Sequence, residues 1–260
     1  MARTIIVANQ KGGVGKTTTA VNLAASLAVM EKKVLVLDCD PQANASSGLG
    51  IDVDEREYNL YSAMFNNEHV QAAICETELP CLHVLPSTHD LVGADLELID
   101  RQDREFVIAR LVDQLDKDYE YILLDCPPSL GLVTVNALCA GRELLIPLQC
   151  EYYALEGIAQ LMQTYEAVKK RLNRHLEIMG VVLTMFDKRN RLSFQVEREV
   201  RTWFPKTTFA TKIPRNVRLS EAPSHGKPAV SYDIRSTGTQ AYIALAREVL
   251  SKENSLTCNH

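Results

Sequence analysis

The sequence has no apolar run near the roughly 20 residues that a helix needs to cross a bilayer. It also lacks a Pro/Gly/Ser-rich or charge-block linker within its 260 residues, which favours one domain. The start, Met1-Ala2-Arg3, leads straight into an apolar run and leaves no room for a secretory signal. These absences predict a cytoplasmic, water-soluble protein with no membrane partner.

The seven cysteines are odd in number and include no C-x-x-C pair. Neither a disulfide framework nor a tetrahedral zinc site is therefore suggested. Cys126 and Cys139 raise the alternative of an iron–sulfur cluster shared across a dimer, but ligand-like spacing is absent. We expect the cysteines to be small packing residues in the core.

An excess of positive charge is lacking too, since the net charge is −5. Between Lys188 and Arg235, however, eleven Lys/Arg and four Asp/Glu give 11 − 4 = +7, which leaves −5 − 7 = −12 for the remainder. This asymmetry predicts an anion-binding face. The alternative is a solvated face of paired charges, because Glu197 and Arg201 stand at i,i+4.

Apolar runs of strand length alternate with segments of helical periodicity. Strands are predicted at Thr4–Ala8, Val34–Asp38, Leu82–Pro86, Tyr121–Asp125, Leu144–Pro147 and Ile178–Thr184. Helices are predicted at Thr17–Met30, Arg104–Leu115, Leu155–Leu172, Ser193–Trp203 and Thr237–Leu250. The alternation favours an α/β fold with a single doubly wound, mostly parallel sheet and helices on both faces.

A glycine-rich loop, Gln10-Lys11-Gly12-Gly13-Val14-Gly15-Lys16-Thr17-Thr18, lies between the first predicted strand and helix. In that context such a loop binds nucleotide phosphates with its N–H groups, Lys16 reaches the β- and γ-phosphates and Thr17 holds Mg²⁺. The loop departs from the standard pattern, with Gln10 where a glycine is expected and Lys11 as a second lysine. The alternative is a flexible glycine turn with two surface lysines. The predicted nucleotide-binding residues are Gly12, Gly13, Val14, Gly15, Lys16, Thr17 and Thr18.

Three aspartates follow predicted strands. Asp125 ends a buried strand before two prolines, which is typical of a carboxylate that holds Mg²⁺, although a turn or capping role is an alternative. Asp38 and Asp40 stand two apart after the second strand, so both would face one side if the strand continued that far. Ligands bind at the carboxyl ends of such strands, and the loop and the aspartates should therefore meet there.

Further strings carry a resemblance that covers about Arg3 to Leu250. They are Leu37-Asp38-Cys39-Asp40-Pro41-Gln42-Ala43-Asn44, Asp125-Cys126-Pro127-Pro128-Ser129-Leu130-Gly131, Gln149-Cys150-Glu151-Tyr152-Tyr153-Ala154-Leu155-Glu156-Gly157, and the stretch from Ile213 to Pro228. The chain resembles the ParA/Soj chromosome-partitioning ATPases of the deviant Walker A, ParA/MinD superfamily. The resemblance implies a P-loop ATPase that uses ATP and Mg²⁺, with slow intrinsic turnover.

The resemblance also implies roles for particular residues. Lys11 would reach the partner subunit's nucleotide in an ATP-sandwich homodimer, Lys16 would act in hydrolysis, and Asp40 would position the attacking water. Mg²⁺ would be held by Thr17 and Asp125 with support from Asp38. The adenine would lie near Met185, Pro214 and Asn216. Non-specific double-stranded DNA would contact Arg189, Arg191, Arg215 and Arg218, and a ParB/Spo0J-type centromere-binding protein would stimulate hydrolysis.

We expect an ATPase domain over residues 1–252 and a disordered polar tail over 253–260. That tail does not resemble the basic amphipathic helix by which the MinD branch binds membranes. A MinD-like positioning ATPase and a nucleotide-gated regulator of replication initiation are the alternatives to a nucleoid-associated partitioning ATPase. Neither the cargo, chromosome or plasmid, nor the identity of the partner follows from the residues.

Overall fold

The computed structural model describes residues 1–54, 56–66, 69–151 and 156–257. Its strands are β1 (Arg3–Val7), β2 (Val34–Asp38), β3 (Cys75–Glu76), β4 (Leu82–Leu85), β5 (Tyr121–Asp125), β6 (Glu143–Gln149), β7 (Glu177–Phe186) and β8 (Thr208–Pro214). They form one eight-stranded sheet in the order β3-β4-β2-β5-β1-β6-β7-β8. Within these residues, only β3 and β4 pair antiparallel. The predicted mostly parallel, doubly wound sheet is confirmed.

All six predicted strands are present, each with bounds within two residues of those expected. The strands missed by the sequence are both edges of the sheet, β3 and β8. β3 has two residues, and β8 mixes threonines and a lysine with its apolar residues, so neither gives a continuous apolar run. An edge strand needs less apolar surface than a central one, which explains the weak signal.

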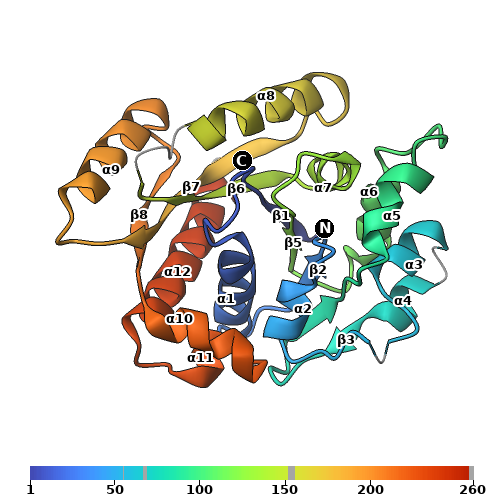
Figure 1. Ribbon diagram of the computed structural model, residues 1–260, viewed down its shortest axis with the longest axis horizontal. Helices are drawn as coiled ribbons and strands as arrows, with labels where there is room; N and C mark the ends of the chain where they lie inside the picture. Colours follow the sequence, from blue (N-terminus) through green and yellow to red (C-terminus); the bar gives the residue numbers. More distant parts are fainter. Residues whose placement is uncertain (55, 67–68, 152–155, 258–260) are drawn as a thin grey trace.

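The helices lie on both faces of the sheet (Figure 1). They are α1 (Lys16–Ala28), α2 (Asn44–Gly48), α3 (Leu60–Phe65), α4 (Val70–Ala73), α5 (Leu91–Glu97), α6 (Val107–Leu115), α7 (Leu132–Ala140), α8 (Glu156–Arg171), α9 (Arg191–Trp203), α10 (Val217–Glu221), the 3₁₀-helix η2 (Ala222–His225), α11 (Ala229–Tyr232) and α12 (Thr237–Thr257). The five predicted helices correspond to α1, α6, α8, α9 and α12. The predicted first residue of α8, residue 155, lies outside the described residues.

Two hydrophobic cores result from the alternation of side chains along the strands. Ile6 of β1 packs in a core with α3, α5, α6, α7, α8 and α9. Its neighbours Ile5 and Val7 face the other side, where they pack with α1, α11 and α12. The central strands β2 and β5 are buried at every position. These strands are therefore packed on both faces, and their carboxyl ends carry the polar residues of the site.

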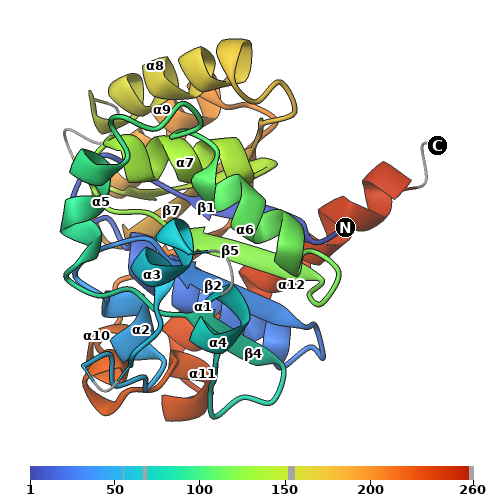
Figure 2. The same cartoon turned by 90° about the vertical axis from the view of Figure 1, so that its right-hand side faces the viewer.

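The last helix, α12, continues to Thr257, and its last turns extend beyond the body of the molecule (Figure 2). No glycine or proline interrupts residues 251–257, so nothing in the sequence ends the helix earlier. Lys252 anchors it, with Nζ 3.7 Å from the ring centroid of Phe209. Across the described part of the chain, no helix is long and apolar enough to cross a membrane.

Substitution of Gly180 tests how closely β7 packs against its neighbours. A Cβ at this position would lie 2.3 Å from the carbonyl oxygen of Thr207 and 2.7 Å from the ring of Phe209. Gly180→Ala should therefore lower the free energy of unfolding by about 1–3 kcal/mol, measured by urea denaturation. Gly93→Ala is the control, because its Cβ would meet only the flexible Glu97 carboxylate, at 3.3 Å, in a helix that favours alanine. Equal stability of both variants would contradict the close packing.

Candidate nucleotide-binding and hydrolytic site

The glycine loop lies between β1 and α1 and faces open space. Gly13 and Gly15 have φ of +74° and +87°, the left-handed region that glycine adopts without strain. A Cβ at Gly12 or Gly13 would meet nothing within 4 Å. The hydroxyl of Thr184 donates to the carbonyl of Val14 at 2.8 Å and ties the loop to β7. The loop is thus an open cradle held on a rigid frame.

Lys16 begins α1 and is buried, with 7% of its surface exposed. Its Nζ donates to the carbonyl of Lys11 at 2.9 Å, so the side chain folds back along the loop. Burial lowers the pKa of Lys16, and the nearby Asp125 opposes that shift. A desolvated ammonium in this position is suited to bind phosphate oxygens.

Asp125 at the end of β5 is completely buried. Neither carboxylate oxygen accepts a hydrogen bond of ordinary geometry from the described residues, although the hydroxyl of Thr17 lies close enough to oppose the rise of its pKa. Burial and then the charge of Asp38 raise the pKa of Asp125 well above its usual range. An unpartnered buried carboxylate beside a threonine hydroxyl fits the oxygen ligands that Mg²⁺ prefers.

Asp38 already has partners within the chain. Its Oδ2 accepts hydrogen bonds from the N–H and the hydroxyl of Ser46 at 2.8 and 2.7 Å. Its Oδ1 accepts from the N–H of Asp40 at 3.2 Å. Burial raises the pKa of Asp38 to about 6, although the hydrogen bonds from Ser46 oppose the shift. The carboxylate fixes the start of α2 and the backbone of Asp40, and a direct metal contact would compete with these bonds.

Asp40 lies two residues beyond β2 and is 8% exposed. Its Oδ1 accepts from the N–H of Gln42 at 3.0 Å, which closes a turn before Ala43, a non-glycine residue with φ of +51°. Asp38, Asp40 and Asp125 come together at the carboxyl ends of β2 and β5, as the sequence predicts. Among the described residues, no cluster of three His, Cys, Asp or Glu side chains is arranged to hold a metal by itself.

The side chain of Lys11 contacts a residue outside its own loop. Its Nζ forms an ion pair with Glu151, and about a third of each side chain is exposed. Glu151 follows β6 by two residues, within the string that was matched to the family, whose residues 152–155 lie outside the described residues. The sequence did not predict this ion pair.

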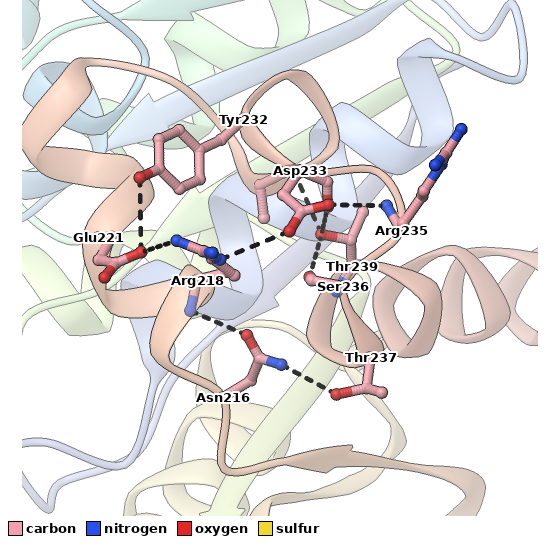
Figure 3. A network of polar contacts seen from close by, with 10 residues as sticks. Asn216, Arg218, Glu221, Tyr232, Asp233, Arg235, Ser236, Thr237 and Thr239 are labelled. Atoms are coloured by element: carbon pink, nitrogen blue, oxygen red, sulfur yellow. Dashed lines mark hydrogen bonds and ion pairs between the residues drawn. The ribbon is translucent and has the colours of Figure 1, made fainter.

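Three residues predicted near the adenine line one cavity. Met185, Pro214 and Asn216 surround a space of about 230 Å³ that also contacts Gly15 and Thr18 of the loop. Met185 has φ of +50°, which is strained for a residue with a side chain. The Asn216 amide caps α10 by accepting from the N–H of Arg218 at 2.9 Å and donates to the hydroxyl of Thr237 at 2.9 Å (Figure 3).

A second cavity, of about 460 Å³, adjoins the first because Thr18 and Pro223 line both. It lies between α1, α2 and η2. Residues that the sequence did not single out line it, notably Asn44, Ser47 and Lys227. The two cavities together extend along the first turn of α1, as a ligand with phosphates, sugar and base requires.

A third cavity, of about 610 Å³, is basic. Five cationic side chains line it, together with Asp187: Lys188, Arg189, Lys212, Arg215 and Arg235. Of the four arginines predicted to bind DNA, only two line it, namely Arg189 and Arg215. Arg191 lies at the start of α9 and is exposed. Arg218 is held between Glu221 at 2.7 Å and Asp233 at 3.5 Å (Figure 3).

The phosphate loop at the end of β1, beside the carboxylate that ends β5, places the chain among the P-loop nucleoside triphosphatases. A family model described as "AAA domain" matches residues 2–178. The chain is 52% identical over 253 residues to the chromosome partitioning protein ParA of Myxococcus xanthus, which covers 97% of this chain and 89% of the relative. It is 51% identical to the sporulation initiation inhibitor protein Soj of Bacillus subtilis, with 96% and 98% covered.

A solved structure agrees with this likeness. A cobyrinic acid a,c-diamide synthase from Mycobacterium smegmatis, with ADP and magnesium bound, has a TM-score of 0.87 and 33% identity over 98% of this chain and 96% of that one. The chain belongs to the ParA/Soj family of chromosome-partitioning ATPases. It is an ATPase whose cofactors are ATP and Mg²⁺.

The raised pKa of Asp38 predicts a pH dependence of stability. Because the folded state holds this proton up to about pH 6 and the unfolded chain releases it near 3.8, the free energy of unfolding should fall as pH rises between these values. Asp38→Asn should reduce that fall by up to about 3 kcal/mol, measured by urea denaturation across the interval. Asp187→Asn is the control. Arg189 lowers the pKa of Asp187, so removal of this carboxylate should not reduce the fall in stability. An unchanged profile in Asp38→Asn would refute the assignment.

Proposed function

We propose that this ATPase forms an ATP-sandwich homodimer that binds DNA non-specifically and is released when a ParB/Spo0J-type protein stimulates hydrolysis. The observation that carries the proposal is that the phosphate loop, Asp40, Asp125 and the basic cavity all lie at the carboxyl ends of the strands. Because they share this end of the sheet, a bound nucleotide can affect the basic cavity. The proposed location is the nucleoid within the cytoplasm.

The residues of the site divide the work of hydrolysis. Gly12, Gly13, Val14, Gly15, Lys16, Thr17 and Thr18 bind the phosphates, and Met185, Pro214 and Asn216 enclose the base. Thr17 and Asp125 would hold Mg²⁺, with Asp38 in support, and the ion would neutralise charge on the transferring phosphoryl group. Asp40 orients the attacking water. Slow intrinsic turnover follows if the site is complete only in the dimer.

Lys11 is the residue proposed to act in the partner subunit. Its ammonium is paired with Glu151, and about a third of its side chain is accessible to a second molecule.

Asn216 uses its side-chain amide in hydrogen bonds within the chain, so its contact with the base would come from its backbone or aliphatic atoms. Lys16, by contrast, lies inside the cradle and acts in cis.

Lys11→Ala tests the dimer. The variant should bind nucleotide almost as wild type does, but its ATP-dependent dimerisation should weaken about tenfold or more, because the charge contact across the interface is lost. Binding is measured with a fluorescent ATP analogue and dimerisation by light scattering. Lys16→Ala is the comparison, since it should lose nucleotide binding itself. Normal ATP-dependent dimerisation of Lys11→Ala would count against the sandwich.

The basic cavity supports the proposal of DNA binding. Its five cations and one acid form a concave surface of net charge about +4 on an otherwise acidic protein, which suits phosphate rather than base recognition. Arg189 is strongly exposed, with 92% of its side chain accessible, and its Nε pairs with Asp187 at 3.2 Å. Arg218 would have to leave Glu221 and Asp233 before it could contact DNA.

Arg189→Ala tests the DNA face. Retention on random-sequence duplex DNA in the presence of ATP should weaken, and the slope of log affinity against log salt should become shallower by about 1. Arg174→Ala is a matched control. Arg174 is also exposed, but it precedes β7 and so lies at the amino-terminal end of this strand, away from the basic cavity. Equal losses in both variants would indicate a general charge effect, and no loss would remove Arg189 from the DNA face.

A further inference from the structure

One buried carboxylate holds both ends of the segment 40–46. Asp38 Oδ1 accepts from the N–H of Asp40 at 3.2 Å, and Asp38 Oδ2 accepts from the N–H of Ser46 at 2.8 Å. Between these contacts the chain turns, and the N–H of Ala43 donates to the carbonyl of Asp40 at 2.9 Å. We call these contacts of Asp38 with Asp40 and Ser46 the Asp38 clamp. Because one carboxylate ties both ends, a change at Ser46 also affects the backbone of Asp40.

Ser46 uses all of its polar groups in this arrangement. It is fully buried, and its hydroxyl donates to Asp38 Oδ2 at 2.7 Å and accepts from the N–H of Ser87 at 3.2 Å. Its carbonyl accepts from the N–H groups of Leu49 and Ile51, each at 3.1 Å. A serine hydroxyl can donate one hydrogen bond and accept two. Ser46 therefore joins the end of β2, the helix α2 and the segment after β4.

The start of α2 depends on the Asp38 clamp. A helix of five residues is too short to be stable alone. Ala43 occupies the N-cap position and has no side-chain oxygen with which to cap the helix. Asp38 accepts from the N–H of Ser46 instead and so caps α2 from the end of β2. Loss of the Ser46 hydroxyl would weaken this contact and leave the N–H of the buried Ser87 without its partner, which is unfavourable.

We propose that Ser46 is a positioning residue for ATP hydrolysis, which acts by fixing Asp40 through the carboxylate of Asp38. The inference rests on the proposed function, in which Asp40 orients the attacking water. Asp40 Oδ1 accepts from the N–H of Gln42 at 3.0 Å, so the direction of its carboxylate follows the turn that the Asp38 clamp holds. A small displacement of a group that orients a reactant can slow the reaction by orders of magnitude.

Amide hydrogen exchange of the full-length protein without nucleotide tests the Asp38 clamp. In Ser46→Ala the amides of residues 40–46 should exchange about tenfold or more faster than in wild type, because the segment is held less firmly. Ser46→Cys should behave in the same way, since a thiol fills the space but donates weakly. Ser26→Ala is the matched control, because it removes a buried hydroxyl that donates to the carbonyl of Asn22 within α1, at 2.6 Å.

Two results of the exchange experiment would overturn the inference. One is unchanged exchange of residues 40–46 in Ser46→Ala. The other is wild-type exchange in Ser46→Cys, which would assign the effect to lost volume rather than to the hydrogen bonds.

Steady-state kinetics of the same variants separate positioning from nucleotide binding. Ser46→Ala and Ser46→Cys should lower kcat for ATP hydrolysis about tenfold or more, with a KM for ATP within about twofold of wild type, because the phosphate loop is unchanged. Ser26→Ala should keep both constants near those of wild type. An unchanged kcat in Ser46→Ala would overturn the inference, as would a higher KM with kcat unchanged.

Asp40→Ala separates this inference from the proposed function. If Asp40→Ala abolishes hydrolysis while Ser46→Ala leaves kcat unchanged, the proposed function stands and Ser46 is not a positioning residue. If Asp40→Ala hydrolyses ATP as wild type does, the proposed role of Asp40 is wrong, and the positioning role of Ser46 is refuted with it.

Discussion

Two buried carboxylates on adjacent strands set the main electrostatic constraint of this structure. Asp38 and Asp125 are register partners on β2 and β5, and both are completely buried. The charge of Asp38 raises the pKa of Asp125, and both carboxylates raise the pKa of the Cys39 thiol, whereas Lys16 opposes the rise at Asp125. Two neighbouring negative charges in a dry site are unfavourable until more positive charge arrives. The site therefore favours binding of a divalent cation together with the phosphates.

Asp38 also links the site to segments outside it through hydrogen bonds. It holds Ser46, and the hydroxyl of Ser46 accepts from the N–H of Ser87 at 3.2 Å, which joins α2 to the segment after β4. Beyond α2, a Cβ at Gly50 would lie 2.9 Å from the carbonyl oxygen of Gly226. The turn after α2 thus packs backbone against backbone on the segment after η2. A displacement near Asp40 cannot be absorbed locally, because glycine contacts of this kind leave no space.

The sequence predicted the parts of the fold with strong apolar periodicity and the parts of the site with a motif. The central strand Tyr121–Asp125 and the carboxylate of Asp125 were placed correctly because burial on both faces leaves a continuous apolar run. The edge strand β8 was missed because its residues alternate weakly. The ion pair of Lys11 with Glu151 could not be foreseen, since it joins residues 140 positions apart (151 − 11) whose proximity depends on the pairing of β1 with β6.

Pro214 and Arg215 connect the cavity beside the phosphate loop with the basic cavity. Both residues line the cavity that adjoins the phosphate loop and also the basic cavity. The end of β8 is therefore a shared wall, and a group that fills one cavity contacts the backbone of the other. Asn216 fixes this wall to the start of α12 through Thr237. A base bound on one side would select positions of Arg215 on the other, which is a physical reason for anion binding to depend on the nucleotide.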